Sequence, residues 1–91
     1  METNCMTKKE SLCFLDECNK RKYFIFGVER FICNKEGKTP DINGIADFSS
    51  LVITEVELSI IAAQSFLSEY GDNLFERFVI TYQEPIEGRL N

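Results

Sequence analysis

Residues 23–33 read YFIFGVERFIC, a run of aromatic and β-branched side chains that is apolar on both faces in its first half. Runs of this kind are typical of strands that are buried on both sides, so we expect a central strand here. Gly27 interrupts the run, which indicates a β-bulge or a close approach of another backbone. The turn residues at 34–38 then predict that the chain reverses into a hairpin.

A helix is expected on either side of this strand. Thr7 and Glu10 have the spacing of a capping box, and the apolar residues that follow them lie on one side of a helix. Thr54 and Glu57 form a second box with the same spacing and predict a second helix. Its core stripe comprises Val56, Ile60, Ala63, Phe66, Leu67 and Tyr70.

Leu58 and Ile61 point away from the core stripe of the second helix. Apolar side chains in this position need a cover. Either another part of the chain covers them, or they contact a partner or a second copy of the chain.

The remaining segments complete a small α+β domain. Residues 75–82 alternate between apolar and polar side chains, which predicts a final strand, and residues 40–50 indicate a short strand or an ordered loop. Residues 83–91 lack periodicity and indicate a flexible tail. The sequence thus predicts one domain over residues 1–91, with an ordered core at about 7–82. In it, an antiparallel or mixed sheet of three to four strands packs against two helices.

The composition excludes several classes of protein. The chain has 91 residues, of which 44% are hydrophobic and none is His, so the usual general base and every His-containing metal site are missing. We therefore expect no enzymatic activity. The longest apolar run, residues 23–28, is far shorter than the roughly 20 residues of a membrane helix, and residues 1–6 do not resemble a secretory signal. These features predict a cytoplasmic protein that does not bind membranes.

The four cysteines stand at positions 5, 13, 18 and 33, and no two of them form a C-x-x-C pair. This spacing is unlike that of zinc sites and redox motifs, so we expect no metal and no cofactor. The prediction is a set of small buried side chains with one or two accessible thiols, of which Cys13 is the most exposed.

The net charge of −5 is distributed unevenly along the chain. Residues 1–38 hold eight basic and six acidic side chains, a balance of +2, whereas residues 39–91 hold two basic and nine acidic ones, a balance of −7. An acidic surface repels nucleic acid and attracts basic proteins. Asp41 and Asp47 lie in this acidic half, but their spacing does not match a calcium loop, and no catalytic or cation-binding role is expected for them.

Three short patterns, at residues 24–29, 63–67 and 78–81, resemble those of small α+β immunity proteins of bacterial toxins. This family includes the immunity protein of the colicin that cleaves tRNA anticodons, and those of contact-dependent growth inhibition and other polymorphic toxins. The resemblance implies a protein that binds the C-terminal domain of its cognate toxin and blocks a basic cleft. The oligomeric state stays open, and a monomer in a 1:1 complex is one alternative. The chain departs from the colicin relative in lacking a Trp-containing stretch after the strand, so the class of toxin stays open.

Four residues are the candidates for toxin binding. Glu29 takes this role from its position in the strand pattern of the family. Asp41, Asp47 and Phe48 are added because they lie between the central strand and the second helix, where carboxylates could meet Lys or Arg and a ring could anchor the interface. Two alternatives to immunity stay open. One is a phage-encoded acidic inhibitor, or nucleic-acid mimic, that acts on a host defence nuclease, and the other is a small regulatory binding domain.

Overall fold

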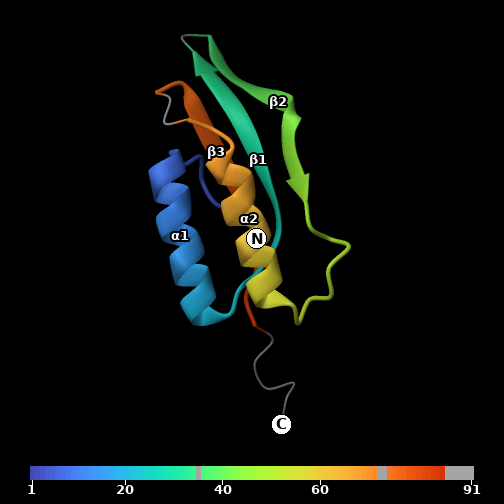
Figure 1. Ribbon diagram of the computed structural model, residues 1–91. Helices are drawn as coiled ribbons and strands as arrows, with labels where there is room; N and C mark the ends of the chain where they lie inside the picture. The colour runs from blue at the N-terminus through green and yellow to red at the C-terminus, as the bar shows by residue number, and fades with distance from the viewer. Residues whose placement is uncertain (35, 72–73, 86–91) are drawn as a thin grey trace.

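The computed structural model describes residues 1–34, 36–71 and 74–85 of the chain. Its elements follow in the order α1 (Lys8–Arg21), β1 (Phe24–Asn34), β2 (Gly37–Asp47), α2 (Val56–Ser68) and β3 (Glu76–Gln83). Figure 1 shows the two helices side by side on one face of the sheet. The structure therefore has the predicted α+β fold.

The sheet is antiparallel, with the strand order β2-β1-β3, so β1 is the central strand as predicted. Beyond β3, the N-terminal segment adds a short fourth strand through antiparallel bridges from Glu2 to Thr81 and from Met6 to Phe78. The Met6 backbone N–H donates to the carbonyl of Phe78 at 2.9 Å. The prediction that the ordered core begins at about residue 7 is wrong, because residues 1–6 satisfy backbone groups along the free edge of β3.

Only the first residue of the predicted tail, residues 83–91, belongs to β3. Gln83 still belongs to the strand, and residues 84 and 85 are exposed and outside regular structure. Residues 86–91, the rest of the predicted tail, lie outside the described part of the chain.

Gly27 meets both expectations for its position. The pairing of β1 with β3 shifts register between Ile25 and Gly27, which is a bulge. In addition, a Cβ atom at Gly27 would lie 2.6 Å from the backbone oxygen of Ala46 on β2. Only glycine leaves room for so close a carbonyl.

The hairpin predicted after β1 is present, and β2 is longer than expected. Gly37 takes a φ of 126° where β2 begins, a conformation that favours glycine. Glu29 pairs with Ile45 and Phe31 pairs with Pro40, so residues 41–44 form a wide bulge opposite Arg30. The irregular composition of residues 40–50 thus corresponds to an interrupted strand.

The first of the two predicted capping boxes, at Thr7, is present, and the prediction of the second, at Thr54, is wrong. Thr7 Oγ1 accepts from the Glu10 N–H at 3.1 Å, and the Thr7 N–H donates to Glu10 Oε1 at 2.9 Å. At α2 the N-cap is Glu55, one residue later than predicted, and it makes no side-chain cap. Its carboxylate instead accepts from the Val52 N–H at 2.9 Å and closes the turn before the helix.

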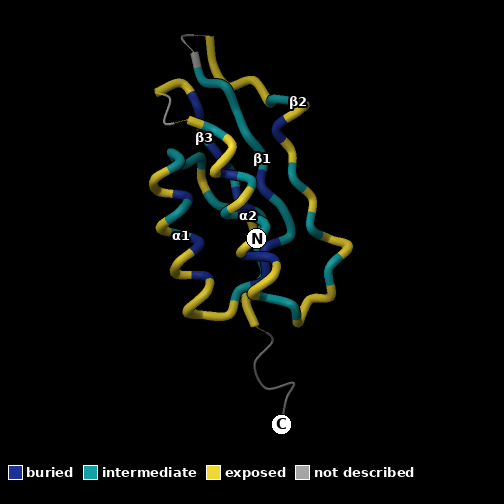
Figure 2. Tube along the Cα trace, in the orientation of Figure 1, coloured by how far each residue is buried: buried dark blue, intermediate teal, exposed yellow. Residues whose placement is uncertain are grey.

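The core lies between the helices and the sheet, and Figure 2 shows buried residues on both helices and on β1 and β3. The predicted stripe of α2 is confirmed, since Ile60, Ala63 and Leu67 are buried and the other three residues are half-buried against the core. Its fully buried partners come from α1 and the strands and include Leu15, Cys18, Ile25, Val28, Phe78 and Ile80.

None of the helices in the described ranges is long and apolar enough to cross a membrane.

Candidate functional site

Two of the four candidate residues share the face of the sheet that points away from the helices. Val28 is buried in the core and pairs with Ile80, so the next residue, Glu29, lies on the opposite face. Asp47 pairs with Gly27, two residues before Glu29, and therefore lies on the same open face. The structure thus brings Glu29 and Asp47 to neighbouring positions, with the exposed Ile45 directly opposite Glu29.

Asp41 is not part of this pair, because the bulge in β2 turns its carboxylate toward Arg30. Asp41 Oδ2 accepts from Arg30 Nη1 at 2.6 Å, and its Oδ1 accepts from the Asn43 N–H at 3.1 Å. Arg30 pairs with the buried Phe78 and lies on the helix side of the sheet. The Asp41 carboxylate is therefore already held by a cation of its own chain.

Arg30 is the centre of a half-buried ionic cluster. Its Nε donates to Glu76 Oε2 at 2.5 Å, and its guanidinium lies 4.7 Å from the centroid of the Tyr70 ring. The side chain of Glu76 is only 5% exposed. Burial acts to lower the pKa of Arg30, but the hydrogen bonds and charges of Glu76 and Asp41 outweigh it and raise this pKa above its usual value. Arg30 thus stays charged and joins β1, the β2 bulge and β3.

Phe48, the candidate anchor, is half-buried and packs against the core. Its backbone N–H donates to the carbonyl of Phe26 at 2.7 Å. In this position it fixes the start of the loop that leads from β2 to α2. Its role in binding a toxin stays a prediction.

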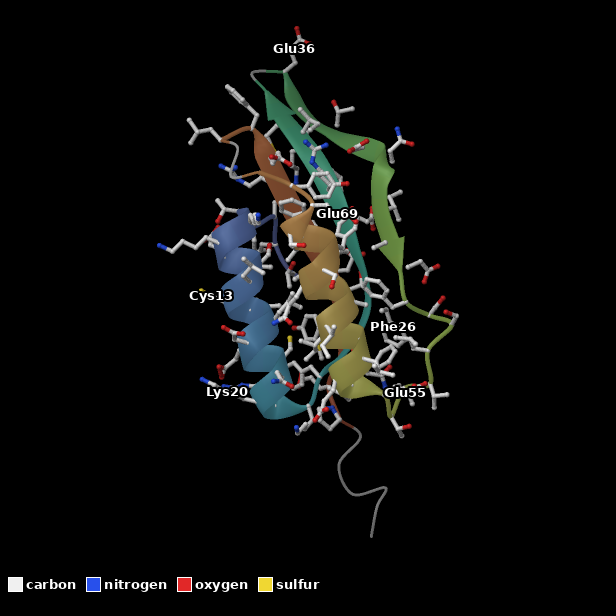
Figure 3. The ribbon with its side chains drawn as sticks, in the orientation of Figure 1. Cys13, Lys20, Phe26, Glu36, Glu55 and Glu69 are labelled. Atoms are coloured by element: carbon white, nitrogen blue, oxygen red, sulfur yellow. The ribbon has the colours of Figure 1, made fainter. Side chains whose placement is uncertain are left out.

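The uneven charge along the sequence is only partly a separation in space, because Arg30 pairs with Asp41 and Glu76, and Lys8 Nζ donates to the carbonyl of Tyr70 just after α2. Residues 39–76 contain seven acidic side chains and no Lys or Arg, and they include most of β2, all of α2 and the loop between them. Basic residues cluster instead at the two ends of α1: Lys8, Lys9, Lys20, Arg21 and Lys22. Figure 3 shows Lys20 on α1 and Glu55 at the start of α2, on opposite sides of the helical layer.

The loop after β2 is held by its own acidic side chains. Asp47 Oδ1 accepts from the Ser49 N–H at 2.8 Å, and the Glu55 carboxylate closes the turn at Val52. Hydrogen bonds from the side chain and backbone of Ser49 lower the pKa of Asp47, so this exposed residue is ionised throughout the neutral range.

Exposed apolar side chains accompany these acids. Val52 and Ile53 lie in the loop, and Leu58 and Ile61 lie on α2; we call these four residues the apolar patch. Of the two alternatives for Leu58 and Ile61, cover by another part of the chain is not seen in the described ranges, since they are 51% and 57% exposed. Sequence reasoning missed Val52 and Ile53, although an apolar triplet, residues 51–53, in a segment without cations was a usable signal.

The four cysteines are free thiols with different surroundings: Cys18 is buried, Cys5 and Cys33 are half-buried, and Cys13 is exposed as predicted. No group of three or more His, Cys, Asp or Glu side chains that could hold a metal ion occurs in the described residues.

The thiols should differ sharply in reactivity. Burial, and then the charge of Glu17, raise the pKa of Cys18 to about 12, so almost none of it is thiolate at pH 8. We expect iodoacetamide at pH 8 to alkylate Cys13 first and to leave Cys18 unmodified, as peptide mass mapping would measure. In guanidinium chloride all four should react at similar rates. Alkylation of Cys18 as fast as Cys13 in the native protein would contradict the burial of this residue.

In comparisons with known proteins, no family model, curated protein or solved structure matches this chain.

Proposed function

We propose that this protein is an immunity protein, a stoichiometric inhibitor that binds the C-terminal domain of a cognate bacterial toxin and covers its basic cleft. The observation that carries the proposal is the excess of acid over residues 39–76, which contain no Lys or Arg and in which Asp47 and Glu57 are exposed. An anionic surface steers a basic partner into contact and repels nucleic acid. A nuclease, whose cleft is basic because it binds phosphates, is the partner that this surface fits best.

The proposed site draws on two groups of acids, one on the open face of the sheet and one in the helical layer, which the loop after Asp47 connects. Glu29 and Asp47 come from the open face of the sheet, and Glu55 and Glu57 come from the start of α2. We assign Asp41 and Phe48 to holding this region in place, because the Asp41 carboxylate is paired with the cation Arg30 and Phe48 packs against the core. The four free thiols agree with action in the reducing cytoplasm, where we place the complex.

The direct test is co-expression with the C-terminal domain encoded by the upstream neighbouring gene. If the proposal holds, that domain kills cells by itself, and cells survive when the protein is present. A purified 1:1 complex, measured by light scattering, should accompany survival. If the domain is toxic and the protein neither binds it nor restores growth, the proposal is wrong.

Charge variants on the two helices provide a matched comparison of the two sides. Glu57→Lys and Asp16→Lys both reverse an exposed helical acid and change the net charge by the same amount. We expect Glu57→Lys to slow association with the toxin domain about tenfold or more at low salt, because steering depends on local charge. Asp16→Lys should have little effect. Stopped-flow association rates at several salt concentrations measure both, and equal slowing by the two variants would show that only net charge matters.

A further inference from the structure

Leu58 and Ile61, the two residues of the apolar patch on α2, lie on the side of the helix that faces away from the core. Leu58 and Ile61 are three residues apart and so lie on the same side of the helix. Ile60, Ala63 and Leu67, which are at most 2% exposed, occupy the opposite side. The outward position of Leu58 and Ile61 thus follows from the burial of the other stripe.

The patch is more than a set of scattered apolar residues. Single exposed apolar side chains are ordinary on protein surfaces. Here, four large ones fall within ten consecutive residues, with exposed fractions of 59% for Val52, 43% for Ile53, 51% for Leu58 and 57% for Ile61. An apolar centre with a polar rim is the usual anatomy of a protein interface.

The charged residues next to the patch along the chain are all acidic. Glu55 lies between the two halves of the patch and Glu57 precedes Leu58, while Asp47 lies at the start of the same loop. Residues 39–76 supply no Lys or Arg to offset these acids.

The negative charge of these acids favours a basic partner over a second copy of the chain as the protein that covers the patch. In a two-fold dimer a surface packs against its own copy, so the acids around the patch would face the same acids of the second copy. Juxtaposed like charges are costly at an interface. A partner with an apolar side chain surrounded by Lys and Arg complements both the apolar centre of the patch and the acids around it.

Resting on the proposed function, we propose that the apolar patch is the centre of the toxin interface. An apolar side chain of the toxin domain packs on Leu58 and Ile61, and neighbouring cations of the toxin pair with Glu55 and Glu57. The patch supplies the slow dissociation of the complex, while the acids supply its fast association.

The test compares uncharged variants, so that electrostatic steering is unchanged. Leu58→Gln with Ile61→Gln removes the apolar centre but keeps the net charge and good helix propensity. Leu74→Gln is the matched control, because Leu74 is 84% exposed and lies in the turn before β3. Circular dichroism and thermal unfolding check that the variants fold. The probe is the purified C-terminal domain of the upstream neighbouring gene product, and surface plasmon resonance measures Kd and the dissociation rate.

We expect the double variant to weaken Kd about 100-fold or more, mainly through faster dissociation, and the control to stay within about threefold of the original protein. If the unmodified protein binds and protects, and the double variant binds equally well, the inference is wrong and the proposed function stands. If the unmodified protein neither binds nor protects, the proposed function fails, and the inference fails with it.

Sedimentation equilibrium of the protein alone tests the competing occupant. We expect a monomer at concentrations up to about 100 μM, far above those used for tight binding. A dimer that Leu58→Gln with Ile61→Gln converts to a monomer would show that a second copy covers the patch, and it would overturn the inference.

Discussion

Replacing Arg30 with Met is expected to lower the free energy of unfolding by about 3–5 kcal/mol at pH 7, because it leaves buried carboxylate charge without a partner. Glu76 is the residue most affected, since its side chain is only 5% exposed and accepts from Arg30 Nε. Asp41 loses the same cation, but at 22% exposure it can reach water. Urea denaturation followed by circular dichroism measures the loss.

Arg21→Met is the matched control, because Arg21 also pairs with a carboxylate. Its Nε donates to Glu17 at 3.0 Å, but the two side chains are 59% and 47% exposed. Solvent screens such a pair, so we expect little change in stability. Equal losses from Arg30→Met and Arg21→Met would show that the buried cluster has no special role.

A second variant separates loss of packing from loss of charge pairing. If unpaired charge causes the defect, Arg30→Met combined with Glu76→Leu should recover a large part of the stability, because apolar side chains often replace a buried ion pair at little cost. If the double variant is less stable than Arg30→Met, the guanidinium stabilises the fold chiefly through its packing on Tyr70.

Changing Gly27 to Ala is expected to destabilise the protein by about 1–3 kcal/mol, since the new methyl group meets backbone rather than a mobile side chain. Its Cβ would lie 2.6 Å from the Ala46 carbonyl oxygen, so β1 and β2 must move apart. The disturbance should extend to the loop that follows Asp47, because the backbone N–H of Phe48 donates a hydrogen bond to the carbonyl of Phe26, the residue before Gly27. Urea unfolding and backbone amide chemical shifts measure the two effects.

Gly71→Ala is the control for this substitution. A Cβ at Gly71 would have no atom of the described, non-adjacent residues within 4 Å. The change should be neutral, or stabilising by up to about 1 kcal/mol through the unfolded state. If Gly27→Ala is as stable as Gly71→Ala, the close approach of β2 to β1 is absent in solution.

Much of the fold was predictable because its signals are local. The central strand, the bulge at Gly27, the hairpin and the alternation of β3 depend on side chains within a few residues of one another. The capping box at Thr7 is local as well. The box at Thr54 failed because a competing bond, from the Val52 N–H to Glu55, was equally local and could not be ranked from sequence.

The candidate site was predicted less well than the fold. Glu29 and Asp47 came together because a simple two-residue periodicity places them on one face of the sheet. Asp41 did not join them, because the bulge at residues 41–44 breaks that periodicity and delivers its carboxylate to Arg30. The length of a bulge depends on the side chains of the neighbouring strand, which are distant in sequence, so a local pattern does not predict it.

The sequence by itself determined the order of the elements, the apolar stripes of both helices and the excess of acid after residue 38, since each depends only on residue type and spacing. The tertiary structure alone decided that the N-terminal segment joins β3, that Arg30 pairs with both Asp41 and Glu76, and that no other described part of the chain covers the apolar patch. These features depend on contacts between residues far apart in the chain, and such contacts exist only once the backbone has brought them together.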